Sequence, residues 1–326
     1  MPYLVGTDEA GYAPNLGPLV ISATVWWIED TTDGADLYWR LKSVVCKSPR
    51  RTIATRSKPP RRLAIADSKA LYSPAQGLAM LERGVLAALG LIDHCPADWL
   101  DAWQALNPEA VEHLPSMPWH VGYDLRLPLV ADAEDLATLV PRLRQHLEKA
   151  ATRLVAIKSR AIFPEQFNHS TDFYGNKGEA LSKITLGLMA EALADCPGED
   201  VLVVCDKHGG RNFYGRLLQQ QFPDVLVEVR GESVAESIYR LGPSGQRIEV
   251  RFRAGGESFL PAALASMTSK YLRELSMRAF NDFWCTRVED LAPTAGYPKD
   301  SRRFRAAIQE AQRSLGIEDR ILWRNR

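Results

Sequence analysis

The chain has 326 residues, of which 46% are hydrophobic and 25% charged, and its 40 Lys and Arg balance 40 Asp and Glu. This composition is typical of a soluble globular protein and excludes a disordered, collagen-like or coiled-coil chain. The longest nearly uncharged run, Pro18 to Ile28, is far shorter than the roughly 20 apolar residues of a membrane span. We therefore expect no membrane association.

Two further features favour the cytoplasm. The chain opens without the charged and apolar stretches of a secretory signal. Its five cysteines are widely scattered and form no C-x-x-C pair, which predicts neither a disulfide framework nor a zinc knuckle. We expect a monomer in a reducing, cytoplasmic environment.

The formal net charge of zero conceals two segments of opposite sign. Residues 93–138 hold nine acids and one base, so this segment carries −8 and the remainder of the chain +8. We expect this acidic segment, which holds Trp99, Trp103 and Trp119, to be an insertion that packs on itself or on the core. The neutral total therefore does not exclude a nucleic-acid partner.

The most basic run extends from Lys47 to Arg62, with seven Lys or Arg, three prolines and no acid. Its prolines and polarity predict a loop rather than a helix. Two interpretations stay open, a solvated surface loop and an arm that contacts phosphates beside a nucleic-acid groove.

Strand-like and helix-like segments alternate along the chain. In order, the pattern predicts strands at Tyr3–Thr7 and Leu19–Ile28, a helix within Ser73–Leu91, a strand at Leu154–Ile157 and a helix at Gly178–Ala194. It continues with a strand at Val201–Cys205, a helix at Asn212–Gln221, a strand at Val225–Val229, a hairpin of Ser237–Leu241 and Arg247–Phe252, and a helix at Ser258–Phe283 that Ser258 caps.

This alternation predicts an α/β fold, a mixed sheet flanked by helices. We expect a single domain, residues 1–326, with the acidic insertion at about 93–138 and a helical C-terminal part from about 258.

Acidic residues follow two of the predicted strands. Asp8 and Glu9 come after the first strand, and Asp206 comes after Val201–Cys205. Ligands of α/β sheets collect at such strand ends, and converging carboxylates that lack a cation resist ionisation. Mg²⁺ or Mn²⁺ would resolve that conflict, and two such ions roughly 4 Å apart support phosphodiester hydrolysis. The competing interpretation is a set of ordinary turn or helix-cap acids.

Five segments, in the same order along the chain, resemble the motifs of type 2 ribonucleases H. They are Gly6-Thr7-Asp8-Glu9-Ala10-Gly11 with Pro14, Ala66-Asp67-Ser68-Lys69-Ala70-Leu71, Cys205-Asp206-x-x-Gly209, the stretch from Ala263 to Glu274, and Gly296-Tyr297-Pro298-x-Asp300. The resemblance omits the acidic insertion and the hairpin near 237–252. It implies a ribonuclease H-like fold, a two-metal site for Mg²⁺ or Mn²⁺, and cleavage of RNA in RNA/DNA hybrids or ribonucleotide-containing duplexes.

The resemblance implies that Asp8, Glu9, Asp206 and Glu274 are the catalytic, metal-binding acids. Glu274 is a departure, because the family has Asp at the matching position and Glu is one methylene longer. Lys270, which the same motif implies to contact substrate, lies four residues before Glu274. A surface ion pair between these two side chains is the competing explanation.

A second departure concerns the segment Gly11-Tyr12-Ala13, where the family has Gly-Arg-Gly pressed against the substrate backbone. The arginine is lost, and Ala13 adds a Cβ where close approach is expected. The resemblance implies that Tyr297 stacks on a sugar and senses its 2′-hydroxyl, the alternative being a core tyrosine. A choice of RNA–DNA junction is therefore less well supported than cleavage itself.

The resemblance further implies that Ser68 and Lys69 contact a phosphate, although Ser68 could instead cap a helix. Asp67 is expected to be structural. His208, beside Asp206, either assists protonation of the leaving group or only hydrogen bonds in the turn.

Two alternatives to a hybrid-cleaving enzyme stay open. One is a catalytically silent or retargeted nucleic-acid-binding protein of the same fold, which Tyr12, Ala13 and Glu274 favour. The other is a nuclease for another structured nucleic acid, such as a DNA junction. A nucleotide-cofactor enzyme and a serine hydrolase are disfavoured, because G-x-G-x-x-G, Walker and G-x-S-x-G motifs are missing.

Overall fold

The computed structural model describes the whole chain except residues 30–35, 48–60, 74, 76, 244 and 326. The basic run Lys47 to Arg62 therefore lies largely outside the described residues. No helix in the described part combines the length and apolar character needed to cross a bilayer.

The centre of the molecule is a seven-stranded sheet in the order β5-β2-β1-β6-β9-β8-β7. Its strands are β1 (Tyr3–Ala10), β2 (Leu19–Ile28), β5 (Thr152–Ile162), β6 (Val201–Asp206), β7 (Glu228–Glu232), β8 (Glu236–Leu241) and β9 (Ile248–Arg253). The neighbours β1, β6 and β9 run parallel, whereas the other pairs are antiparallel. A separate pair consists of β3 (Val45–Cys46) and β4 (Leu63–Ala64).

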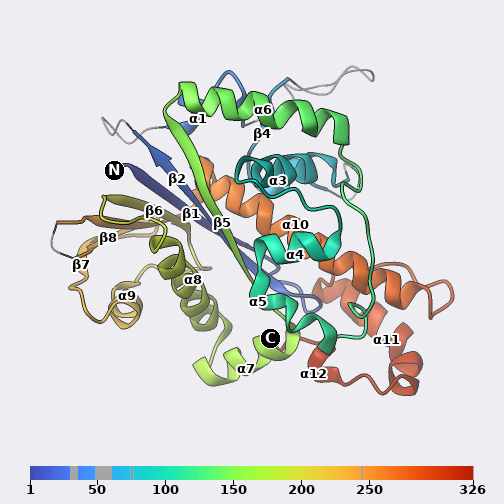
Figure 1. Cartoon of the computed structure of the whole chain (residues 1–326). Helices are drawn as coiled ribbons and strands as arrows, with labels where there is room; N and C mark the ends of the chain where they lie inside the picture. The colour runs from blue at the N-terminus through green and yellow to red at the C-terminus, as the bar shows by residue number, and fades with distance from the viewer. Residues whose placement is uncertain (30–35, 48–60, 74, 76, 244, 326) are drawn as a thin grey trace.

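Helices cover both faces of this sheet, with α3, α6 and α10 on one side and α8 and α9 on the other (Figure 1). The first half of the chain holds α1 (Leu37–Arg40), α2 (Ser68–Leu71), α3 (Ala79–Leu91), α4 (Trp99–Leu106), α5 (Pro108–Val111), η2 (Leu114–Ser116) and α6 (Ala133–Lys149). The second half holds α7 (Pro164–Tyr174), α8 (Lys177–Leu193), α9 (Gly215–Gln221), η3 (Gly256–Ser258), α10 (Leu260–Cys285), α11 (Pro298–Ser314) and α12 (Asp319–Leu322). The predicted class, a mixed sheet flanked by helices with a helical C-terminal part, is confirmed.

Several predicted boundaries are wrong by a few residues. The first strand extends to Ala10. Asp8 and Glu9 therefore lie inside the strand, where it still pairs with β2, rather than after its end. The strand predicted from Val225 begins only at Glu228. Ser258 does not cap α10, because it is the last residue of the short helix η3 and Phe259 holds the N-cap position of α10.

Helix α10 packs very closely against β1 and β2, which fixes its position relative to Asp8. A Cβ on Gly6 would lie 2.0 Å from the amide nitrogen of Ala262, so only glycine lets the helix pack this closely. The Thr24 hydroxyl donates to the Pro261 carbonyl over 2.8 Å. Farther along the helix, the Ser269 hydroxyl donates to the Asp8 carbonyl over 3.0 Å.

The acidic insertion packs on the core rather than only on itself. Trp99 and Trp103 are buried, and the Trp99 indole donates to the Leu275 carbonyl of α10 over 3.2 Å. Trp119 meets Phe280 of α10 edge to face, with ring centroids 5.1 Å apart. The insertion therefore supplies aromatic side chains to the same core cluster as α10.

Candidate functional site at the ends of three parallel strands

Strand register brings the predicted acids together. In the parallel ladder of β1 and β6, Thr7 is level with Cys205, so Asp8 and Asp206 follow at the same end of adjacent strands. In the next ladder, Asp206 is level with Arg253 at the end of β9. The convergence expected from strand-end positions therefore occurs for Asp8, Glu9 and Asp206.

These carboxyl groups oppose one another's ionisation. Burial raises the pKa of Asp8 well above its usual value, and the neighbouring charges of Glu9 and Asp206 raise it further. Burial also raises the pKa of Glu9 to about 7, with a contribution from Asp206, while Lys69 acts in the opposite direction. Such a cluster is stabilised when positive charge enters it.

Glu257 is a further acid at this site that the sequence analysis missed. The amide of Gly256 donates to Oδ1 of Asp206 over 3.1 Å, and a Cβ on Gly256 would lie 3.1 Å from the Asp206 nitrogen. Asp67 raises the pKa of Lys69 most, followed by Asp8, Glu257 and Asp206, so the Lys69 ammonium lies within range of all of them. Glu257 lies in η3, four residues after the end of β9, so only a strand-end criterion extended into the following turn could have found it.

Glu274 of α10, in contrast, forms its hydrogen bonds with residues outside this group of acids. Its carboxylate accepts from Lys270 over 2.5 Å and from the Tyr72 hydroxyl over 2.8 Å. The Lys270 ammonium also lies 4.6 Å from the centroid of the Tyr72 ring. Both Glu274 and Lys270 thus form the ion pair that the sequence analysis gave as the competing explanation.

The segment Gly11-Tyr12-Ala13 continues directly from β1. Gly11 has a φ of +89°, and a Cβ there would lie 2.6 Å from the Pro18 carbonyl oxygen, so a side chain at this position is excluded. Tyr12 is half-buried beneath Lys177, whose ammonium is 4.8 Å from its ring centroid, whereas Ala13 is exposed.

Two buried arginines hold the loop that begins at Gly11. Arg324, near the C-terminal end, donates to the carbonyls of Gly11 and Pro14. Arg273 of α10 donates to the Pro18 carbonyl over 2.5 Å. The loop after β1 is therefore fixed by residues from the last part of the chain.

The remaining predicted substrate contacts differ in their accessibility. Lys69 is exposed, but Ser68 is buried and hydrogen bonds to the Ser266 hydroxyl, while the Asp67 carboxylate caps α2. Tyr297 is 52% exposed at the start of α11, which excludes a core tyrosine.

His208 is buried against Tyr214 and Phe252, and its Nδ1 lies 3.0 Å from the Ser182 hydroxyl. Burial, helped by Arg211, lowers the pKa of His208 to about 3, so its ring is neutral near pH 7. It supports the turn rather than exposing a proton donor.

The donors at the strand ends match hard divalent cations in chemistry. Mg²⁺ and Mn²⁺ prefer carboxylate oxygen ligands, and Asp8, Glu9, Asp206 and Glu257 offer only such oxygens. Across the part of the chain that the structure describes, however, no three His, Cys, Asp or Glu side chains are arranged closely enough to hold one ion. Binding a metal here therefore requires the carboxylates to turn toward a common point.

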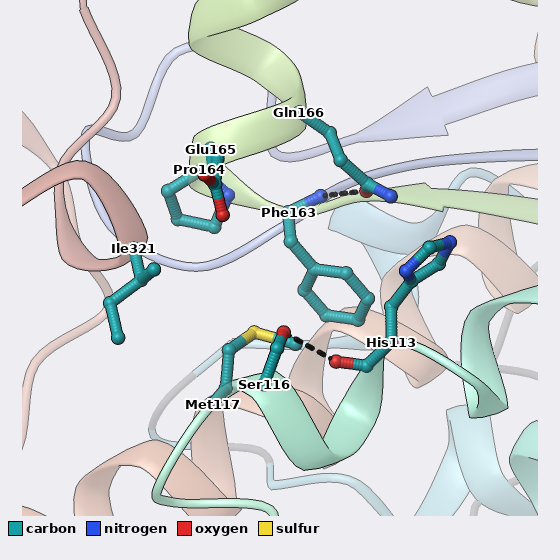
Figure 2. Close-up of a pocket in the computed structure, with 8 residues that line it drawn as sticks. All are labelled: His113, Ser116, Met117, Phe163, Pro164, Glu165, Gln166 and Ile321. Carbon is teal, nitrogen blue, oxygen red and sulfur yellow. Dashed lines mark hydrogen bonds between the residues drawn. The ribbon is translucent and has the colours of Figure 1, made fainter.

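A separate small pocket lies away from these acids. His113 to Met117 of the insertion, Phe163 to Gln166 at the start of α7, and Ile321 of α12 line it (Figure 2). Its volume is about 60 Å³, far below the roughly 300 Å³ at which small-molecule sites begin. None of the clustered carboxylates lines it, so we do not assign it a substrate.

No model of a known protein family matches the chain. No curated protein matches it either.

Several solved structures show a distant similarity. Ribonuclease H2 from Pyrococcus horikoshii OT3 is 14% identical, with a TM-score of 0.47 over 98% of this chain and 92% of that one. RNase HII from Archaeoglobus fulgidus, solved in a complex with PCNA, is 14% identical, with a TM-score of 0.42 over 99% and 94%. Bst-RNase HIII in complex with Mn²⁺ is 14% identical, with a TM-score of 0.40 over 98% and 65%. Similarity at this level does not assign the chain to a family or an activity.

Proposed function

We propose that this protein is a metal-dependent endonuclease that hydrolyses the RNA strand of RNA/DNA hybrids, in the manner of a type 2 ribonuclease H. The observation that carries the proposal is the group of Asp8, Glu9 and Asp206 at the ends of β1 and β6. Carboxyl groups with raised pKa values that gather at strand ends are typical of catalytic and metal-binding sites. The five motif resemblances in the sequence point to the same chemistry.

The metal-binding residues in this proposal are Asp8, Glu9 and Asp206, with Glu257, which follows the Gly256 amide bound to Asp206, as the candidate fourth acid. Two bound Mg²⁺ or Mn²⁺ ions would neutralise these carboxylates, activate a water and stabilise the leaving 3′-oxygen. The exposed Lys69 ammonium, already drawn toward the same carboxylates, is suited to contact a backbone phosphate.

The exposed ring of Tyr297 supplies a stacking surface for a sugar or base. The substrate is a hybrid or a ribonucleotide-containing duplex, and the products carry 5′-phosphate and 3′-hydroxyl ends.

The proposal is tested by cleavage of an RNA/DNA hybrid in Mg²⁺ and in Mn²⁺. Asp8→Asn and Asp206→Asn remove one metal-binding charge each with little change in volume, and both should abolish cleavage. Asp172→Asn, at an exposed acid of α7, is the matched control and should retain it. Wild-type activity in either cluster variant, with the fold verified by thermal unfolding, refutes the assignment.

A binding protein without turnover is the second candidate. It is favoured by the engagement of Glu274 with Lys270 and Tyr72, together with the loss of the Gly-Arg-Gly segment at Tyr12 and Ala13. Hybrid binding that weakens steeply with salt, with no cleavage in either metal, would select it.

A further inference from the structure

A second concave surface adjoins the carboxylate cluster on the α8 side of the sheet. It lies between Tyr12, Gly178 in the first turn of α8, and the loop from His208 to Phe213, here called the 208–213 loop. Its volume of about 420 Å³ falls within the roughly 300–1,000 Å³ range of small-ligand sites. Of its lining residues, the motif resemblances cover Tyr12 and Gly209, but they assign no role to Arg211, Asn212 or Phe213.

The 208–213 loop is held rigidly at its base. The Lys207 ammonium donates to the Asn212 side chain over 2.7 Å and to the Ser233 carbonyl over 2.6 Å. At the far end, Tyr214 accepts from the His208 amide over 3.0 Å and stacks on Phe252 at a centroid distance of 3.6 Å. A loop fixed in this way presents its tip in a defined position.

Phe213 stands at the mouth of the pocket and is 71% exposed. An aromatic ring on a rigid loop that remains in water forgoes the stabilisation of burial. Exposed aromatic rings of this kind are the stacking platforms on which proteins hold unpaired bases. Phe213 therefore points to a flat ligand with a π-face.

Arg211 lines the pocket, and Arg216 and Lys177 place further positive charge beside it. Glu179 binds both Arg211, over 2.6 Å, and Arg216, over 3.3 Å, so that one carboxylate is shared by two guanidinium groups. Lys177 adds its ammonium above the Tyr12 ring. An excess of positive charge beside exposed rings suits a nucleotide better than an uncharged aromatic ligand.

The pocket also adjoins the carboxylate cluster along the chain, because two of its lining residues, Tyr12 and His208, follow Glu9 and Asp206 by three and two residues. Burial is the largest cause that raises the pKa of the Tyr12 phenol. The charge of Glu9 raises this pKa further, and the charge of Arg211 lowers it. The phenol thus lies within range of both the cluster and the 208–213 loop. A polynucleotide strand bound at the cluster would therefore lie beside this pocket.

We propose that the pocket is a subsite for one unpaired nucleotide of the substrate, with its base stacked on Phe213 and its phosphate facing Lys177 and Arg211. This inference rests on the proposed function, because it takes the strand at the cluster to be a nucleic acid. It extends that function, because the protein would then bind hybrids that carry an unpaired nucleotide near the cut more tightly than fully paired ones.

The test measures the binding of fluorescent hybrids by anisotropy in the absence of divalent metal. One probe is fully paired, and each of the others carries one unpaired nucleotide at a different position. We expect the wild type to bind the best unpaired probe roughly five- to tenfold more tightly than the paired one. Phe213→Ala should abolish this difference, and Phe213→Tyr should retain it. Phe173→Ala, at another exposed phenylalanine that does not line the pocket, is the matched control.

Equal wild-type affinity for all probes, a preference that survives Phe213→Ala, or no binding of any probe overturns the subsite. Failure of the proposed function is separate, because it appears as absence of metal-dependent cleavage of the paired hybrid. Cleavage without a preference removes only the subsite, whereas a Phe213-dependent preference without cleavage removes only the nuclease.

Discussion

Glu9 illustrates how a single residue couples the site to stability. Burial and Asp206 raise its pKa from 4.5 to about 7. The folded protein then holds a proton that the unfolded chain releases, so the metal-free protein loses stability as pH rises from about 4.5 to about 7.

We expect Glu9→Gln to flatten this decline, because the amide has no proton to lose. Thermal unfolding in a chelator at about pH 5 and about pH 8 measures the effect as the difference between variant and wild type. An identical pH dependence of the two melting temperatures would contradict the prediction.

Added Mn²⁺ should raise the wild-type melting temperature most at the higher pH, since a proton and a cation compete for the carboxylates.

The fourth acid of the site is tested by comparing Glu257→Gln with Glu274→Gln. Glu257 lies next to the Gly256 amide that binds Asp206, whereas Glu274 is bound to Lys270 and Tyr72. We expect Glu257→Gln to raise the Mn²⁺ concentration needed for half-maximal cleavage by roughly tenfold or more, and Glu274→Gln to change it little. The opposite ranking would restore Glu274 as the metal-binding acid.

For single residues, the sequence predicted which acids lie together at the strand ends. It did not predict which way the side chains of α10 point. Asp8 and Asp206 could be paired from two strands alone. Along α10, Ser269 faces Asp8 while Glu274 faces Tyr72, and which residue takes which direction depends on how the helix docks at Gly6. That docking is a tertiary property, so a motif position alone gave no means to separate Glu257 from Glu274.

Among the elements, α3, α10 and the end of the acidic insertion are joined through one buried carboxylate. Glu82 of α3 is 0% exposed and accepts from the amides of Leu129, Val130 and Ala131 over 2.7–2.8 Å, and from the Tyr271 hydroxyl over 3.1 Å. Such a fully satisfied buried group is costly to remove, because its partners are left without acceptors.

We therefore expect Glu82→Ala to lower the free energy of unfolding by roughly 3 kcal/mol. Chemical denaturation measures the change, and Glu310→Ala at an exposed position of α11 is the control, with an expected change within about 0.5 kcal/mol. A Glu82→Ala variant as stable as the control would show that the 129–131 segment does not depend on this carboxylate.

The strands of the seven-stranded sheet and the helices α3, α8, α9 and α10 were predictable because hydrophobic periodicity governs them, whereas α6 and α7 were not predicted. The ends of the elements were less predictable, and the reasons are local. β1 continues through Asp8 and Glu9 because pairing with β2 persists to Ala10, although polar residues suggest a turn. The position of the insertion followed from tertiary contacts, such as Trp99 with Leu275, which no periodicity predicts.

For the whole molecule, the neutral net charge results from a basic body and an acidic insertion that packs on it. Trp99 and Trp103 are core residues, so deleting the insertion would damage the fold. Its exposed acids can be neutralised instead, for example by Asp101→Asn, Glu112→Gln and Asp124→Asn.

We expect this triple variant to bind a hybrid more tightly than the wild type at low ionic strength, because three fewer negative charges repel the phosphates. The gain should vanish near 0.15 M salt, where screening limits such effects to about 8 Å. Titrations at two salt concentrations measure it. Equal low-salt affinities would mean that these acids are too far from the bound nucleic acid to matter.

The central claim, that the strand-end carboxylates form a ribonuclease site, is tested most directly by a substrate panel with wild type and Asp206→Asn. The panel holds duplex DNA, duplex RNA, an RNA/DNA hybrid, a duplex with one ribonucleotide and a branched DNA, each in Mg²⁺ and in Mn²⁺. We predict that the wild type cuts only ribonucleotide-containing hybrid substrates, leaving 5′-phosphates, and that Asp206→Asn cuts none. Cleavage of DNA alone, or wild-type cleavage by Asp206→Asn, would contradict it.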